Sequence, residues 1–530
     1  MFVRIYSSQA QAIFVPGATQ TGRRPLAALL WLGAITLLGL ALRLWAIGAK
    51  GLWLDEAFSI WMSRHALGEL LDWLVRIDQH PPLYYTLLHF WLAAGDREGW
   101  VRSLSALFST TTIPLFYGFV RTLAGERAGL IAALLLAIAP FHVRFAQEAR
   151  MYALLTFAVA GALCCLAWLL AGEGREARGE GRRRAAWIGY VLFTVAALLT
   201  HNTALFFPAA VNLFVLPFLL VRRRRRAAPS APAVESALAE LQPPALRHWL
   251  LAQAAIIALW LPWSGAFVQQ SLGVYAHFWL AAPTLQTVLD ALFVFLSAFF
   301  PAPAPWKSSV WLFFGGFFIV GLWQLRVRPA QLALLLALWL TPFVGEWLVS
   351  LRRPIFYDRT LIWASLPLYA IVAVGMARVP RRALLAVALA ALLLIQGVAL
   401  DNYYRNFAKE DWRGAAAYLA ARYQPDDLLL FNATWVQIPF DYYFERTGIA
   451  AERRGAPADL FDAGVLEPIM GTADVPRLAS LLDDRARVWL IYSHDWYTDP
   501  QRLISAALDK EFDLLDRQSF YGLELRLYAR

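Results

Sequence analysis

Long apolar segments alternate with short polar ones along the first 400 residues of the chain. Eleven of them approach the roughly 20 residues that an α-helix needs to cross a bilayer. They lie near residues 25–47, 101–121, 126–140, 152–171, 186–203, 204–221, 248–265, 308–325, 331–350, 360–377 and 383–400. The pattern predicts a polytopic α-helical membrane protein with about 11 transmembrane helices within residues 1–400.

One further apolar segment, from Thr284 to Phe300, has a different interpretation. Counting it as a span would put the end of the chain inside and would move Arg326, Arg328 and the pair Arg381-Arg382 to the outer side. Short loops rich in Arg and Lys face the cytoplasm in most membrane proteins. We therefore expect an outer interfacial or re-entrant segment here, and the prolines that follow it fit a break in regular helix.

From residue 401 the chain changes character, because polar and apolar residues mix as they do in a soluble domain. Residues 427–432, 487–492 and 523–528 have the pattern of short strands, and residues 411–422, 475–482 and 501–510 that of helices. Alternation of strands and helices is typical of an α/β domain. Residues 401–530 are therefore expected to form a C-terminal soluble α/β domain.

Composition and charge support a membrane protein with a defined orientation. Hydrophobic residues make up 59% of the chain and charged residues 16%, which is too apolar for a soluble protein of this length. The net charge is +10, yet residues 401–530 hold 15 basic and 21 acidic side chains, so the positive excess lies between the spans. Basic loops between spans indicate the cytoplasmic side and not a nucleic-acid partner. We expect a multi-pass cell-membrane protein with a cytoplasmic N-terminus and an extracytoplasmic C-terminal domain.

Two adjacent carboxylates, Asp55 and Glu56, directly follow the first span and are flanked by Trp53 and Phe58. In a partly dry site, neighbouring like charges have their pKa values pushed apart, so one of the two can act as a base. With the expected topology, further polar residues collect in the outer loops. They include Asp78, His80, Glu148, Arg150, Tyr152, His201, Tyr357 and Arg359. Ionisable residues at the membrane are costly, so their convergence on one face predicts a functional site.

Each of these residues also has a structural explanation. Asp55 and Glu56 could cap a juxtamembrane helix, and Glu148 could pair locally with Arg144 or Arg150. His80 could sit in a rigid turn before Pro81-Pro82, and Arg359 could extend its side chain to the membrane surface. No two histidines have the i,i+4 spacing of a helical metal site. An acidic pair can hold a divalent cation together with a phosphate, so the sequence leaves a divalent cation open and makes no cofactor certain.

Four motifs in this order resemble those of a known enzyme family. They are Leu54-Asp55-Glu56, His80-Pro81-Pro82-Leu83-Tyr84-Tyr85, Gln147-Glu148-Ala149-Arg150-Met151-Tyr152 and Asp411-Trp412-Arg413. The chain resembles the polytopic GT-C glycosyltransferases of family 39, the bacterial and archaeal relatives of protein O-mannosyltransferases and of the lipid A aminoarabinose transferase. The resemblance covers the membrane portion well and the tail only through the last motif.

The resemblance implies a glycosyltransferase that uses a polyprenyl phosphate sugar as donor at the outer membrane face, with Asp55 as catalytic base and Glu56 beside it. The phosphate leaving group requires cationic partners, such as Arg150 or Arg359. Direct attack by an acceptor hydroxyl would invert the anomeric centre. The acceptor is a glycan, a lipid or a protein, and membrane lipid is the remaining partner. The expected substrate-binding residues are His80, Tyr84, Glu148, Arg150, Tyr152, Tyr357 and Arg359.

The alternatives are a polytopic transporter or lipid flippase and a non-catalytic sensor or scaffold. Transporters place their charged residues near the bilayer midplane in broken helices and usually contain internal repeats. Here the charged residues cluster in the outer loops, and no two-fold repeat is evident in the sequence. The segment after Thr284 lacks polar residues that could place the sugar, so no sugar contact is assigned.

Overall fold

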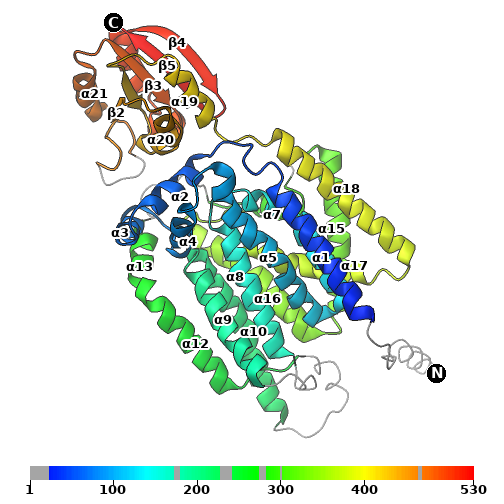
Figure 1. The fold of residues 1–530 in the computed structure, drawn as a ribbon. Helices are drawn as coiled ribbons and strands as arrows, with labels where there is room; N and C mark the ends of the chain where they lie inside the picture. The colour runs from blue at the N-terminus through cyan, green and yellow to red at the C-terminus, as the bar shows by residue number, and fades with distance from the viewer. Residues whose placement is uncertain (1–22, 172–179, 227–240, 274–281, 299–300, 463–467) are drawn as a thin grey trace, which may run out of the picture.

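The computed structural model describes residues 23–171, 180–226, 241–273, 282–298, 301–462 and 468–530. Most of the chain forms a bundle of long helices, and the last part forms a small sheet domain at one end of that bundle (Figure 1). Helix α1 begins at the end of the bundle that is remote from the sheet domain (Figure 1). Within the described residues, eight helices are long and apolar enough to cross a membrane, or nine if one bent pair counts as a single span. The protein is a multi-pass membrane protein.

All eleven predicted spans coincide with helices. Most are single helices: α1 (Arg23–Leu44), α5 (Glu98–Ala124), α8 (Tyr152–Leu170), α9 (Glu180–Leu198), α10 (Phe206–Arg226), α12 (Leu246–Trp260), α15 (Ala304–Leu325), α16 (Pro329–Ser350), α17 (Ser365–Ala377) and α18 (Arg382–Asn406). The predicted span at 126–140 is the bent pair, because α6 (Glu126–Ile138) turns by 56° into α7 (Pro140–Ala146) at Ala139-Pro140. Proline fixes φ and has no N–H to continue the helical ladder, which accounts for the bend.

Two of the eleven helices are less suited to crossing a membrane. Helix α9 begins with Glu180 and three arginines, Arg182 to Arg184, so part of its length is polar. Helix α17 and the short turn before it cover only residues 362–377. This explains why fewer helices meet the length and hydropathy of a span than the eleven that the apolar pattern predicts.

The ambiguous segment after Thr284 forms the short helix α14 (Leu285–Leu296), which has 12 residues. At 1.5 Å per residue such a helix is too short to cross the hydrocarbon core. Its N-terminus is capped by Thr284, whose Oγ1 accepts a hydrogen bond from the N–H of Thr287 at 3.3 Å. The length of α14 is therefore that of an interfacial or re-entrant segment, as expected from the charge pattern.

The segment between the first two spans, which the sequence predicts as the first outer loop, folds into three helices between the bundle and the sheet domain (Figure 1): α2 (Leu54–Arg64), α3 (Leu67–Ile77) and α4 (Leu83–Leu92). Helix α2 is mostly buried, with Glu56, Phe58 and Ile60 among its enclosed residues. It packs against α4 on one side and against helix α20 (Gln437–Phe444) of the sheet domain on the other. The acidic pair therefore lies in the contact region between the two parts of the molecule.

The C-terminal part is a five-stranded mixed sheet in the order β2-β1-β3-β5-β4. Its strands are β1 (Leu428–Phe431), β2 (Glu452–Gly455), β3 (Arg487–Tyr492), β4 (Asp513–Phe520) and β5 (Leu523–Ala529). Strands β2, β1 and β3 are parallel, whereas β5 runs antiparallel to both β3 and β4. Its other helices are α19 (Trp412–Ala420), α21 (Val475–Leu482), α22 (Asp495–Thr498) and α23 (Leu503–Glu511).

The three strands and three helices predicted for the tail are confirmed as β1, β3, β5, α19, α21 and α23. Strands β2 and β4 were not predicted. The residues of β2, Glu-Arg-Arg-Gly, form a polar edge strand, and β4 is largely exposed, so neither shows the pattern of a buried strand. Helix α18 continues without a break to Asn406, several residues beyond the expected boundary at 400. The connection to the sheet domain is therefore the short segment 407–411.

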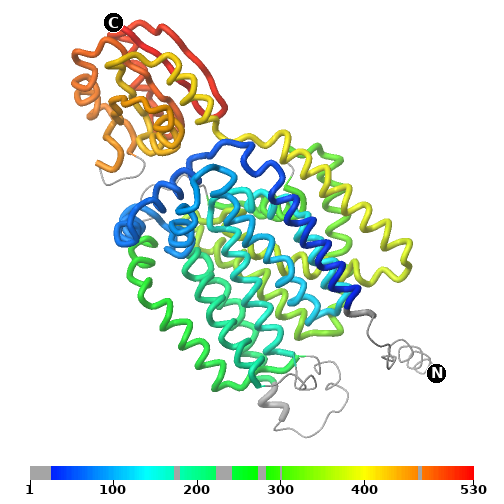
Figure 2. Tube along the Cα trace, viewed as in Figure 1, coloured from blue at the N-terminus to red at the C-terminus, as the bar shows by residue number. Residues whose placement is uncertain are grey.

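The two parts share one buried core. It runs from the bundle helices through α2 to side chains of the sheet domain such as Trp412, Phe440 and Leu525. The trace in Figure 2 shows the segment after α1 beside the segment after α18, and Lys50 Nζ there donates a hydrogen bond to the carbonyl of Tyr404 at 2.9 Å. The Leu52 N–H also donates to the Tyr443 hydroxyl at 2.7 Å. These contacts fix the sheet domain over the outer loops.

Candidate active site

A cavity of about 440 Å³ lies between the outer loops, the α16–α17 connection and the sheet domain. This volume is within the range of ~300–1,000 Å³ that is usual for small-molecule sites. Six of the predicted site residues line it: Asp55, His80, Arg150, Tyr152, Tyr357 and Arg359. They come from four separate stretches of sequence, and the fold brings them to one place.

The carboxylate of Asp55 is paired with two arginines. Arg359 Nη1 donates to Asp55 Oδ2 at 3.0 Å, and Arg150 Nε is 3.8 Å from the same oxygen. Burial disfavours the charged form of Asp55, but Arg150 and Arg359 outweigh burial and lower its pKa below the ordinary value for an aspartate. Asp55 is therefore ionised at neutral pH.

Arg359 is held in a cage of aromatic rings. Its guanidinium lies 4.7 Å from the centre of the Tyr357 ring, 5.8 Å from that of Tyr152 and 5.9 Å from that of Trp53. A delocalised guanidinium stacks well on aromatic faces. This side chain points into the molecule and is only 21% exposed, so it does not have the position of a snorkelling anchor.

The acidic pair does not cap its helix. Trp53 occupies the N-cap position of α2 and makes no side-chain cap hydrogen bond. Instead, the N–H of Leu54 in the first turn donates a hydrogen bond to Glu410 Oε2 at 3.3 Å, and Glu410 lies at the start of the C-terminal part. Two carboxylates in the first turn are favoured by the helix dipole. Their side chains remain available for the cations around them.

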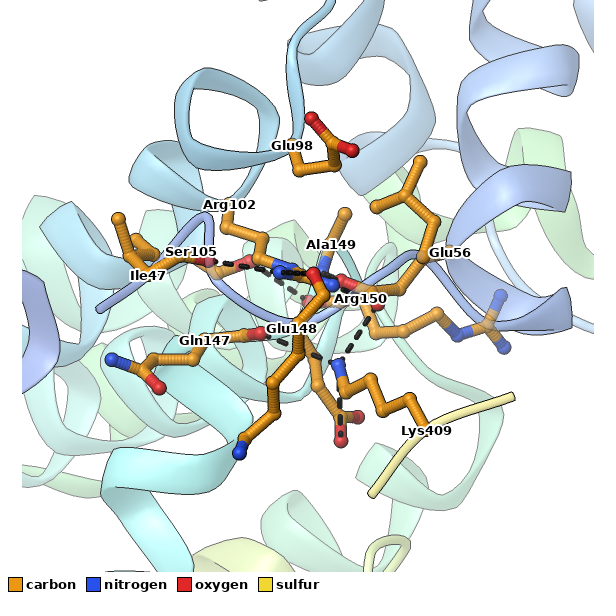
Figure 3. Close-up of polar contacts among 12 residues, drawn as sticks. Ile47, Glu56, Glu98, Arg102, Ser105, Gln147, Glu148, Ala149, Arg150 and Lys409 are labelled. Carbon is orange, nitrogen blue, oxygen red and sulfur yellow. Dashed lines mark hydrogen bonds and ion pairs between the residues drawn. The ribbon is translucent and has the colours of Figure 1, made fainter. Parts of the chain in front are cut away.

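Glu56 lies in a buried cluster of charges beneath the cavity (Figure 3). Its Oε1 accepts from Arg102 Nε at 2.7 Å and from the N–H of Ala149 at 2.9 Å. Its Oε2 accepts from Arg102 Nη2 and from Lys409 Nζ, both at 2.8 Å. Burial would raise the pKa of Glu56, but Arg102 and Lys409 lower it to about 2. Although the sequence predicts a catalytic Glu56, its carboxylate is fully occupied here and does not line the cavity.

Glu148 and Tyr84 do not line the cavity either, although the sequence predicts substrate contacts for both. Glu148 Oε1 lies 3.3 Å from Arg144 Nε and 3.9 Å from Lys409 Nζ, which is the local ion pair that was the structural explanation for this residue. Tyr84 is fully buried, and its hydroxyl is hydrogen-bonded to Ser105 Oγ at 3.1 Å. Both side chains therefore have partners within the protein and lie outside the lining of the cavity.

Two further polar side chains of the cavity, Asp78 and His201, were not among the predicted site residues. Asp78 Oδ1 lies 2.9 Å from His80 Nδ1, and the rings of His80 and His201 are 5.2 Å apart. His201 Nδ1 accepts a hydrogen bond from the N–H of Thr203 at 3.2 Å. Burial and the nearby His80 hold the pKa of His201 well below its usual value, so this imidazole is neutral. The spacing Asp-x-His in the first outer loop was the signal that could have indicated Asp78.

The sheet domain also contributes to the site. Trp435, in the loop after β1, lines the cavity, and Lys409, just after α18, pairs with Glu56. No sequence signal connects either residue to the outer loops, because the contact depends on how the sheet domain docks. Within the described ranges, no group of three or more His, Cys, Asp or Glu side chains could hold a metal ion.

Comparison with known proteins shows which proteins this chain is similar to. Residues 79–241 match the family described as dolichyl-phosphate-mannose-protein mannosyltransferase. No curated protein matches the sequence.

The whole fold matches solved structures. ArnT from Cupriavidus metallidurans in the apo state has a TM-score of 0.64 at 14% identity, over 94% of this chain and 98% of that chain. The same protein bound to undecaprenyl phosphate gives 0.63 at 13% identity, over 94% and 98%. The Archaeoglobus fulgidus oligosaccharyltransferase in the apo form gives 0.58 at 12% identity, over 91% and 71%. At these low identities, the structural likeness shows that the fold is shared and nothing more.

The family match over residues 79–241 and the likeness of the whole fold make this chain similar to GT-C glycosyltransferases of the protein O-mannosyltransferase and ArnT-like type. The resemblance inferred from the four motifs is thereby confirmed, as is the membrane bundle with its C-terminal sheet region. A transporter or flippase does not account for the family match.

The Glu56 cluster generates a prediction about stability. Glu56→Gln leaves Arg102 and Lys409 buried without their shared anion, which typically costs about 3–5 kcal/mol. We expect a clear fall in the thermal unfolding midpoint of the purified protein in detergent. Glu69→Gln on the exposed face of α3 is the matched control and should leave the midpoint unchanged. Equal midpoints for the two variants would contradict a structural role of the cluster.

Proposed function

We propose that the protein transfers a sugar from a polyprenyl phosphate donor to an acceptor hydroxyl at the outer membrane face, with inversion and with Asp55 as general base. The observation that carries this proposal is an ionised carboxylate that shares one cavity with two arginines, the buried Arg150 and the partly buried Arg359. A lipid-linked donor presents a phosphate and a sugar at membrane depth, so its enzyme needs cations for the first and a base near the second.

Arg150 and Arg359 are the proposed phosphate ligands. Guanidinium groups bind phosphate oxygens in a fork geometry that a point charge does not reproduce. Within the described part of the chain, the Nε of Arg150 is buried and makes no hydrogen bond, so it has a donor to offer a ligand. The solved ArnT carries undecaprenyl phosphate, and AglB from Archaeoglobus fulgidus is in complex with an inhibitory peptide and a dolichol-phosphate. These neighbours support a lipid phosphate donor here.

The proposed reaction balances as a single displacement. The acceptor oxygen attacks the anomeric carbon from the face opposite the phosphate and forms the new C–O bond. The bond between the anomeric carbon and the phosphate oxygen breaks, and its electrons leave with the polyprenyl phosphate. Asp55 accepts the proton of the acceptor hydroxyl. The acceptor is a hydroxyl on a glycan, a lipid or a protein.

Donor binding would also strengthen the base. In the free protein Asp55 is held by the same two guanidinium groups that the phosphate requires. When a phosphate binds to these two guanidinium groups, they stabilise the charged form of Asp55 less. The effect of burial then raises the pKa of Asp55. Asp78, His80 and Glu410 are the other charged or titratable groups that act on Asp55. The carboxylate would thus become a better proton acceptor at the moment that the donor is bound.

The first prediction concerns topology. The basic loops and the short α14 support a sheet domain outside the cytoplasm. A reporter fused after Arg530 that is active only in the cytoplasm should be silent, and a reporter that works only outside should be active. The opposite pair of signals would overturn this orientation and would require an additional span.

The second prediction tests the base. Asp55→Asn keeps the size of the side chain and removes its basicity, so turnover should fall by roughly 10²–10⁴-fold. Binding of polyprenyl phosphate, measured by titration, should be retained or become tighter, because a competing anion is removed from the arginines. Asp72→Asn, on the exposed side of α3, is the control and should behave as the wild type.

The pH profile provides a second readout for Asp55. A base must be ionised, so activity is lost as the pH falls through its pKa. The acid limb of kcat/KM reports the free enzyme and should lie below the ordinary aspartate value of about 3.9. The acid limb of kcat reports the donor complex and should lie at higher pH. Near-normal turnover of Asp55→Asn would show that another group is the base.

The third prediction concerns the phosphate ligand. Arg359→Lys keeps the charge but loses the fork geometry, so affinity for polyprenyl phosphate should fall. Arg76→Lys, an exposed arginine of α3 that pairs with Asp72, is the matched control. An unchanged dissociation constant for Arg359→Lys would transfer the phosphate role to Arg150.

A further inference from the structure

The sheet domain has the geometry of a ligand-binding α/β sheet. Strands β1 and β3 are adjacent and parallel, and their carboxyl ends lie at the same edge. The chain leaves β1 toward β2 on one side, and it leaves β3 toward β4 and β5 on the other. The connections after two neighbouring strands therefore run in opposite directions along the sheet. In open α/β sheets such a switch point is where ligands bind.

This edge of the sheet is turned toward the cavity. Trp435, in the loop after β1, lines the cavity together with Asp55. His494, in the loop after β3, packs on the Trp435 ring with the ring centres 5.1 Å apart. His494 Nε2 lies 3.4 Å from Glu410 Oε1, and the second carboxylate oxygen of Glu410 accepts from the N–H of Leu54, the residue before Asp55. The loop after β3 is thus connected through Glu410 to the first residue of α2, which carries Asp55.

The two loops are fixed to each other before any ligand binds. Asn432, at the end of β1, donates from Nδ2 to the carbonyl of Ser493 at 2.7 Å and accepts at Oδ1 from the Ser493 N–H at 2.9 Å. Asn432 is fully buried, so these hydrogen bonds are shielded from water. A preorganised pair of loops lowers the entropic cost of binding.

Trp435 has an unused hydrogen-bond donor. Its side chain is only 7% exposed, and among the residues that the structure describes its Nε1 has no hydrogen-bond partner. A buried indole N–H usually finds a partner. Other tryptophans in the described ranges also have an unpartnered Nε1, but Trp435 is the one of them that lines the cavity, where a ligand would supply the missing acceptor atom.

We propose that this edge of the sheet domain, formed by Trp435 and His494, is the acceptor subsite and that the acceptor is an uncharged saccharide. The inference rests on the function proposed above and names the acceptor of that reaction. The part of the Trp435 indole that borders the cavity can contact the C–H face of a sugar ring, while its N–H and the imidazole of His494 can bind sugar hydroxyls. The arginines that line the cavity, Arg150, Arg353 and Arg359, all belong to the membrane part. The charged phosphate therefore binds on the membrane side and the uncharged acceptor on the sheet side.

The test compares donor and acceptor kinetics for the purified full chain in lipid nanodiscs. Polyprenyl phosphate sugars are first screened for cleavage with water as acceptor. Neutral oligosaccharides and Ser/Thr peptides are then supplied as acceptors. For Trp435→Ala we expect the KM for the saccharide to rise at least about 10-fold. The donor KM and the slow donor hydrolysis should change by less than about threefold.

Two further variants keep the test interpretable. Trp435→Phe retains a ring and removes only the N–H, so it should fold normally and show a smaller rise in the saccharide KM. Leu515→Ala, an exposed apolar residue on the far edge strand β4, is the control and should leave all constants unchanged.

Several outcomes would overturn the inference. They are an unchanged saccharide KM in Trp435→Ala, an equal rise of the donor KM, or transfer only to peptide hydroxyls. A wild-type protein that cleaves no polyprenyl phosphate sugar would instead contradict the proposed function itself, so the two failures are distinguishable.

Discussion

The buried carboxylate of Glu56 is the interaction on which the site depends. It binds Arg102 of α5, the backbone of Ala149 before α8 and Lys409 after α18, so a single side chain joins three distant parts of the sequence to α2. A charge without a partner is costly in such an interior, and the geometry is therefore strongly specified. Because Asp55 and Arg150 are the direct neighbours of Glu56 and Ala149, the same cluster sets the position of the carboxylate and of one proposed phosphate ligand.

Two adjacent acidic residues thus have different roles because their surroundings differ. Glu56 is enclosed and has all its lone pairs occupied, whereas Asp55 faces a cavity and shares its cations with whatever binds there. A carboxylate with permanent partners is a structural element. With the proposed donor phosphate bound to Arg150 and Arg359, Asp55 would share its cationic partners with that phosphate, and its pKa would change on binding. This division follows from the environment and not from the residue type.

The sheet domain extends the same principle. Its docking brings Lys409 to the charge cluster, Glu410 to the start of α2 and Trp435 to the cavity wall. The membrane part supplies the cations and the carboxylate, and the sheet domain closes the cavity with an aromatic surface. Neither part contains the complete site alone.

The sequence by itself determined most of the helices and strands and most of the candidate site residues. Apolar length predicts helices because a bilayer demands about 20 apolar residues, and the strands of the tail with buried faces show their period. It also indicated Asp55, His80, Arg150, Tyr152, Tyr357 and Arg359, because ionisable groups at the membrane are costly and these converge on one predicted face. Polar edge strands such as β2 left no such pattern. Only the tertiary structure showed that Asp55 faces the cavity and Glu56 does not. It also showed that Tyr84 and Glu148 lie outside the cavity lining, and that Asp78, His201 and Trp435 belong to it. Burial and partner choice are properties of contacts between distant segments, and a linear pattern does not contain them.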